Sequence, residues 1–169
     1  MKIASWNVNS LKVRLPQALD LINLNQPDVL CLQETKQNND NFPHDVFEQQ
    51  GLFSTHNGQN TYNGVAIISN KELINVQFDI PNFHDDQKRL ISGIYPNDEG
   101  PKLRIISAYI PNGQSLNSDK FEYKKNGSIH LLIFYKRKLM ELIILLLEIL
   151  ILLHQSWIFM TLNHGMEKF

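Results

Sequence analysis

The first 33 residues alternate apolar runs with polar breaks in the order strand, helix, strand. Residues 2–8 and 28–33 are short, mostly apolar runs of strand length. The Asn-Gln-Pro-Asp sequence at 25–28 separates the second run from a helix that Ser10 can cap. These segments predict a βαβ unit. The apolar residues on one face of its helix are Leu11, Leu15, Ala18, Leu19 and Ile22.

From residue 64 the pattern changes to short strands separated by turns. Strand-like runs cover residues 64–69, 73–78, 89–95 and 102–109, with Asn-, Pro- and Gly-containing turns between them. Connections this short favour antiparallel pairing. Residues 1–123 are therefore predicted to be an α/β unit.

The stretch from residue 124 to the end departs from this pattern. Residues 139–153 contain twelve Leu or Ile residues, and besides these only Met140, Glu141 and Glu148. Apolar residues would surround every face of a helix here. The run is also short for a membrane span, which needs about 20 mostly apolar residues. The pattern therefore gives this stretch no clear role.

Composition limits the class of protein without identifying its function. The chain has 169 residues, 43% of them hydrophobic and 20% charged, which is typical of a globular domain rather than a disordered chain. A net charge of −1 gives no basic footprint for nucleic acid. The single cysteine, Cys31, lies in an apolar run and is predicted to be a buried thiol. No signal peptide is evident, so a cytoplasmic location is expected.

Two polar residues lie at the ends of the predicted parallel strands. Asn7 ends the first apolar run, and Glu34 follows the second. Strand ends in a βαβ unit meet at one edge of the sheet, so both side chains could face one cleft. A carboxylate beside an amide suits Mg²⁺, which prefers oxygen ligands. Spacing alone favours the plainer alternative, in which Glu34 is a solvated charge and Asn7 a turn former.

Four motifs in order resemble those of a known enzyme family. They are SWNVN at 5–9, QPDVLCLQETK at 26–36, NGVAI at 63–67 and AYIPNG at 108–113. Through these motifs, residues 1–123 closely resemble the exonuclease III branch of the endonuclease/exonuclease/phosphatase enzymes. The resemblance implies the N-terminal half of a four-layer, DNase I-like α/β sandwich. It also implies hydrolysis of DNA that depends on Mg²⁺ or Mn²⁺, both as a 3′→5′ exonuclease and by incision at abasic sites. The parent enzyme is expected to act as a monomer and without a membrane.

The resemblance also assigns roles to individual residues of the chain. Glu34 would be a metal ligand, and Asn7 would help to organise the metal and phosphate site. Tyr109 would approach the scissile phosphate, and Asn112 would line the same cleft from the loop that follows. An enzyme that acts on phosphoinositides, or a nonspecific DNase, is an alternative within the same superfamily.

Two basic residues are weaker candidates for DNA contacts. Arg89 resembles a family arginine that precedes a strand near the DNA, although a surface arginine is the alternative. Lys36 could contact the DNA backbone or be a solvated lysine. The histidines His44, His56 and His84 match no motif and are expected in loops or on the surface.

The second half of the family pattern is missing from residues 124–169. The family carries a Gly-Asp-x-Asn segment, a later aspartate and a C-terminal Asp-His pair, and this chain has none of them. Read from the third base of each codon, residues 147–153 permit Gly-Asp-Phe-Asn-Ile-Ala-Pro. The codons for Lys124, Lys125 and Asn126 can form an uninterrupted run of adenines, where polymerases slip. We therefore interpret residues 124–169 as a frameshifted tail and expect the chain itself to be inactive.

Two other classes of function stay open at this point. The chain could be a non-catalytic remnant of the parent enzyme. It could also be a membrane-tethered binding module anchored by residues 139–153, although the two glutamates in that run and the coherent shifted frame argue against this.

Overall fold

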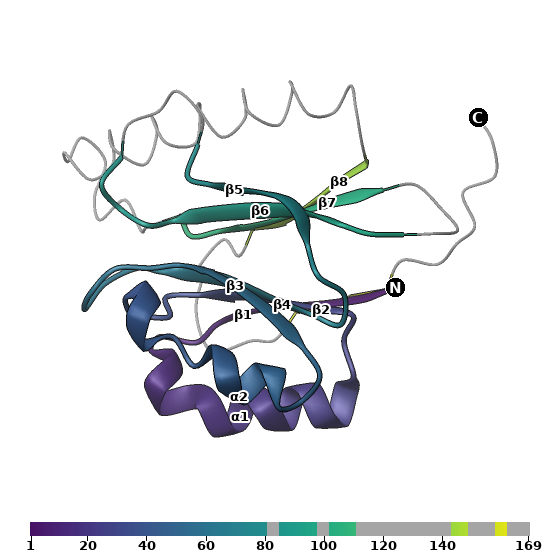
Figure 1. The fold of residues 1–169 in the computed structure, drawn as a ribbon, viewed down its shortest axis with the longest axis horizontal. Helices are drawn as coiled ribbons and strands as arrows, with labels where there is room; N and C mark the ends of the chain where they lie inside the picture. The colour runs from purple at the N-terminus through teal and green to yellow at the C-terminus, as the bar shows by residue number, and fades with distance from the viewer. Residues whose placement is uncertain (81–84, 98–101, 111–142, 149–157, 162–169) are drawn as a thin grey trace.

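Two β-sheets pack face to face, and helices cover the outer face of one of them (Figure 1). This computed structural model describes residues 1–80, 85–97, 102–110, 143–148 and 158–161, the last two ranges by their strands only. The elements in chain order are β1 (Lys2–Asn7), α1 (Leu11–Asn25), β2 (Val29–Gln33), the 3₁₀ turn η1 (Asn39–Asn41), α2 (His44–Glu48), β3 (Phe53–Asn57), β4 (Val65–Ser69), β5 (Ile74–Phe78), β6 (Leu90–Tyr95), β7 (Leu103–Ala108), β8 (Ile143–Glu148) and β9 (Ile158–Thr161).

The first sheet has the strand order β3-β4-β2-β1-β9 and contains the predicted βαβ unit. Strands β1 and β2 are parallel, with Asn7 opposite Gln33 at their carboxyl ends. Strands β3 and β9 join antiparallel to β4 and β1. The parallel register brings the loops that follow β1 and β2 to the same edge of the sheet.

The second sheet has the strand order β5-β6-β7-β8. Strands β5, β6 and β7 are antiparallel, as the short turns predict, and Leu90 at the start of β6 pairs with Ala108 at the end of β7. Strand β8 runs parallel to β7, with Glu148 opposite Ala108. The segment before β6 and the ends of β7 and β8 therefore lie together.

The core forms in two layers because β2 is covered on both faces. Its five residues are all buried, as expected of a strand inside an α/β fold. Leu30 and Leu32 pack toward the helices, whereas Val29 and Cys31 pack against the second sheet. Cys31 is the predicted buried thiol. Opposite it, the second sheet contributes Ile91, Tyr95, Leu103 and Ile105.

One predicted detail of helix α1 is wrong. Within the described residues, the side chain of Ser10 makes no capping hydrogen bond. Instead, the backbone N–H of Ser10 donates to Glu34 O at 2.8 Å, and that of Leu11 donates to Thr35 O at 3.0 Å. The loop after β2 thus supplies acceptors for the first two N–H groups at the start of the helix.

Two strands lie in the range 124–169, to which the sequence pattern assigned no element. Strand β8 occupies part of the Leu- and Ile-rich run, and β9 pairs with β1. The boundary at residue 123 and the frameshift stay predictions. Of the helices in the described ranges, none is long and apolar enough to cross a membrane.

Candidate active site

The loops after β1 and β2 have an uncommon backbone shape. Asn9 and Ser10 have φ values of 43° and 101°, and Glu34 and Lys36 have values of 52° and 54°. Positive φ is rare for residues with side chains and costs free energy, so the surrounding structure must enforce it. The backbone bond from Ser10 to Glu34 joins the two loops directly. The edge of the first sheet is therefore a specifically shaped surface.

Asn7 and Glu34 contact each other at this edge. Asn7 Nδ2 donates to Glu34 Oε1 at 2.8 Å. Asn7 Oδ1 accepts from the backbone N–H of Asn9 at 3.0 Å, which fixes the orientation of the amide. The parallel register of β1 and β2 accounts for this proximity, as the sequence predicted.

An ammonium group lies among the oxygen atoms of this edge. Lys36 Nζ is 3.5 Å from Glu34 Oε2 and also donates to Asn9 Oδ1. Carboxylate and amide oxygens that already contact one cation are the ligand types that Mg²⁺ prefers. In the described ranges no group of three or more His, Cys, Asp or Glu residues could hold a metal. A single carboxylate still suits Mg²⁺, which keeps several waters and also binds substrate phosphates.

Tyr109 brings the second sheet to the same place. Burial, followed by the charge of Glu34 and a hydrogen bond with it, raises the pKa of Tyr109 to about 12. The protonated phenol is thus favoured over the charged form even more than in an exposed tyrosine. The Cζ atom of Arg89 lies 5.2 Å from the centre of the Tyr109 ring, and the Tyr109 N–H donates to Arg89 O at 2.8 Å. Asn112 lies outside the described residues.

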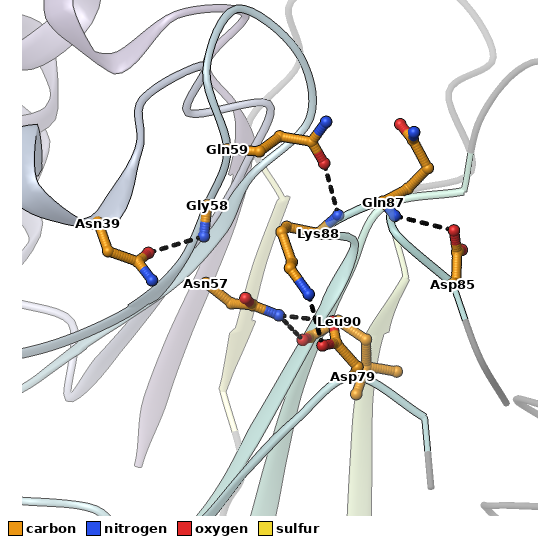
Figure 2. Close-up of polar contacts among 9 residues, drawn as sticks. All are labelled: Asn39, Asn57, Gly58, Gln59, Asp79, Asp85, Gln87, Lys88 and Leu90. Carbon is orange, nitrogen blue, oxygen red and sulfur yellow. Dashed lines mark hydrogen bonds and ion pairs between the residues drawn. The ribbon is translucent and has the colours of Figure 1, made fainter. Parts of the chain in front are cut away.

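The segment that carries Arg89 is held by polar contacts on its N-terminal side (Figure 2). The Lys88 backbone N–H donates to Gln59 Oε1 at 2.7 Å, and Lys88 Nζ lies 3.0 Å from Asp79 Oδ2. Asn57 Nδ2 donates to Asp79 Oδ1 at 2.8 Å. These contacts join β3 and its following loop to the second sheet. They therefore fix the position of Arg89 relative to the edge.

His56 is a correction to the sequence analysis. It lies in β3 and is buried, whereas His44 is exposed as expected and His84 is outside the described residues. His56 Nε2 is 2.8 Å from Thr35 Oγ1, and its ring stacks on Phe42 with centroids 4.1 Å apart. Burial lowers the pKa of His56 to about 3. The neutral ring thus supports the loop that carries Glu34.

The structure brings together five of the six site residues that the sequence predicted. It also adds one neighbour that the sequence analysis did not single out. Asn7, Glu34, Lys36, Arg89 and Tyr109 gather where the two sheets meet. The missed neighbour is Asn9, whose side chain contacts Lys36. Its position two residues after Asn7, in the same loop, was the available signal.

Comparisons with known proteins agree with this arrangement. A sequence model of the Endonuclease/Exonuclease/phosphatase family matches residues 4–160. Exodeoxyribonuclease III of Haemophilus influenzae is 35% identical over 127 residues, which cover 74% of this chain and 47% of the relative. DNA repair nuclease APEX1 of Danio rerio is 30% identical over 135 residues, which cover 76% and 42%.

Solved structures give the same picture. A 3′ phosphatase from Neisseria bound to a product DNA hairpin has a TM-score of 0.79 at 40% identity, covering 84% of this chain and 54% of that one. An AP endonuclease from Archaeoglobus fulgidus has a TM-score of 0.75 at 34% identity, covering 81% and 51%. The chain spans about half the length of these relatives.

Proposed function

Because the chain belongs to the endonuclease/exonuclease/phosphatase family, we propose that its edge of Asn7, Glu34 and Tyr109 is half of a site that hydrolyses DNA phosphodiesters. The relatives are an exodeoxyribonuclease III, a 3′ phosphatase and an AP endonuclease, so the predicted family resemblance and the DNase I-like α/β fold are confirmed. The activity, the substrate and the cofactor of this chain are the proposal.

The observation that carries the proposal is the contact between Asn7 and Glu34 beside a protonated tyrosine. Glu34 would hold Mg²⁺ or Mn²⁺ through its carboxylate, and Asn7 would help to organise this metal site. When bound, such an ion polarises the phosphate and stabilises the leaving oxygen. The residues of the chain provide orientation: Asn7 fixes one carboxylate oxygen of Glu34 at 2.8 Å.

The remaining residues would bind the phosphate and the DNA strand. The phenol of Tyr109 is protonated at neutral pH, as is usual for tyrosine, so it could donate a hydrogen bond to a phosphate oxygen. Arg89 lies against the Tyr109 ring and places positive charge beside that oxygen. We propose that Arg89 and Lys36 contact the DNA backbone and that Asn112 lines the same cleft. Phosphate contacts of this kind position a duplex without reading its sequence.

The proposed substrate is duplex DNA with 3′ ends or abasic sites. The names of the relatives support this choice, because they include an exodeoxyribonuclease, AP endonucleases and a 3′ phosphatase bound to DNA. The location in the cytoplasm and action as a monomer are proposed with it.

We further propose that residues 124–169 are translated out of frame and that the chain alone does not catalyse. The register of β8 supports this, because Glu148 at its end pairs with Ala108, next to Tyr109. The shifted reading begins Gly-Asp-x-Asn at that same strand end. In the shifted reading an aspartate follows the glycine at this strand end, as in the family motif.

The test compares the chain with a version whose reading frame is restored after residue 124 and continued through the following DNA. Both are incubated with Mg²⁺ and a duplex containing one abasic site. We expect nicking by the restored protein, strong loss of nicking in its Glu34→Gln variant, and none by the chain as given. An inactive restored protein would contradict the nuclease assignment. Nicking by the given chain at the restored rate would contradict its inactivity.

A further inference from the structure

A buried glutamine joins the two sheets directly behind the candidate site. Gln33 is the last residue of β2, and its side chain is 1% exposed. Gln33 Nε2 donates to Ser5 Oγ and to Ser107 Oγ, each at 3.2 Å. Ser107 Oγ in turn donates to Leu32 O at 3.3 Å. A polar chain therefore runs from β1 through β2 to β7 between the two sheets.

This glutamine is an unfavourable choice for stability alone. Among the residues that the structure describes, Gln33 Oε1 has no hydrogen-bond partner. A buried polar atom without a partner lowers stability, whereas an apolar side chain of similar size would avoid that cost. Val65 lies opposite Gln33 on the neighbouring strand β4, and an apolar side chain such as methionine could pack beside it. The polar head of Gln33 is therefore better explained by what it orients.

The residues that this amide connects are close in sequence to the proposed site residues Glu34 and Tyr109. Gln33 precedes Glu34 and pairs with Asn7 in the parallel register. Ser107 lies two residues before Tyr109, and side chains two apart share one face of a strand. The single amide thus connects the strand that leads to Glu34 with the strand that leads to Tyr109.

We propose that Gln33 is a positioning residue, whose amide bridge from Ser5 to Ser107 sets the distance and orientation between Glu34 and Tyr109. Gln33 itself would contact neither substrate nor metal. It would act through Glu34 and Tyr109, which it positions. The inference rests on the proposed function only for the roles of Glu34 and Tyr109. The bridge itself is a structural relationship that can be tested without catalysis.

Two variants break the bridge from opposite ends. Gln33→Met keeps the length of the side chain and removes both polar atoms, and Ser107→Ala removes the acceptor on β7. Ser69→Ala is the matched control, because Ser69 is a buried strand serine whose hydroxyl donates locally to Lys71 O at 2.7 Å. The parent protein and these three variants are prepared with meta-fluorotyrosine. The resonance of Tyr109 among the five tyrosines is assigned with Tyr109→Phe.

The readouts are the ¹⁹F resonance of Tyr109 in metal-free protein, its paramagnetic broadening by bound Mn²⁺, and the Mn²⁺ dissociation constant. We expect both bridge variants to shift the resonance, to weaken the broadening and to raise the dissociation constant by about tenfold, the lower range for loss of residues that orient metal ligands. The unfolding midpoint is recorded as well, because Gln33→Met removes the partnerless oxygen but also the hydrogen bonds to Ser5 and Ser107. Ser69→Ala should match the parent protein in every readout.

A purely structural role would give a different result. It would lower the unfolding midpoint of the folded variants and leave the resonance, the broadening and the affinity unchanged, and this would overturn the proposal. If Gln33→Met does not fold, Ser107→Ala decides by the same criteria. If the parent protein binds no Mn²⁺, the proposed function fails. The ¹⁹F resonance of Tyr109 in metal-free protein then still tests the role of Gln33.

Discussion

The amide of Asn7 donates to Glu34 Oε1 at 2.8 Å, although 27 positions separate the two residues in the chain. The contact arises because β1 and β2 are parallel and end together, with Asn7 opposite Gln33. An amide that also accepts from Asn9 N–H can present only its NH₂ group to the carboxylate. Glu34 thus has one oxygen fixed and the other directed to a cation.

Asn7→Ala should weaken the binding of Mn²⁺ by about tenfold, because residues that orient a metal-binding carboxylate typically contribute that much or more. Isothermal titration calorimetry with the chain as given measures this. Asn23→Ala, at an exposed position of α1, is the control and should bind like the parent protein. Equal losses in both variants would contradict a specific role for Asn7.

His56 should make the fold sensitive to mild acid. Folding lowers the pKa of His56 from 6.5 to about 3. Between these pH values the unfolded chain binds a proton at His56 and the folded protein does not. Stability is therefore fully present above about pH 6.5 and is lost as the pH falls toward 3, at up to about 1.4 kcal/mol per pH unit. Urea unfolding between these pH values measures the slope.

The matched variants for this prediction are His56→Gln and His44→Gln. The first removes the titrating group and should flatten the slope, although it also lowers the stability at neutral pH because the ring stacks on Phe42. The second changes an exposed histidine and should keep most of the slope. An unchanged slope in His56→Gln would assign the acid sensitivity to other groups.

Gly64→Ala should destabilise the loop beside Glu34. Gly64 has a φ of 87°, and an added Cβ would lie 2.1 Å from Thr35 Oγ1. Backbone strain and the displaced Thr35 together should cost about 3 kcal/mol in the free energy of unfolding. Gly51→Ala is the control: its φ is 72°, but among the described residues nothing lies within 4 Å of its added Cβ. Strain alone there should cost about 1 kcal/mol.

The reading frame can be settled by sequencing the gene across the codons for Lys124, Lys125 and Asn126 and through the DNA that follows. We expect one further adenine in that run, after which the frame opens to Gly-Asp-x-Asn and later to an Asp-His pair. If the given frame is confirmed, the tail is a true product of the gene. The edge of Asn7 and Glu34 would then belong to a remnant of the ancestral site.

Local pattern was sufficient to predict the parts of the fold that depend on short-range order. The apolar runs around α1 fixed β1 and β2, and the βαβ connection then required Asn7 and Glu34 to lie at one edge. The turn residues between residues 73 and 109 indicated the antiparallel pairing of β5, β6 and β7. The short turn between β4 and β5 connects the two sheets instead of a pair of neighbouring strands.

Features that depend on tertiary contacts could not be predicted in this way. Strand β3 has the polar sequence Phe-Ser-Thr-His-Asn, and His56 is buried only because Phe42 and Thr35 cover it. The acceptors for Ser10 come from a distant loop. The contact of Arg89 with Tyr109 depends on the register of β6 and β7, which no single segment encodes.

The position of Lys36 has a consequence for how the edge would load its metal. Lys36 Nζ already neutralises Glu34 Oε2 and is bonded to Asn9 Oδ1. A divalent ion arriving at Glu34 therefore exchanges with an internal counterion rather than adding to a bare carboxylate. The carboxylate then exchanges a partner of charge +1 for one of charge +2. Any incoming ion must therefore compete with the Lys36 ammonium for the Glu34 carboxylate.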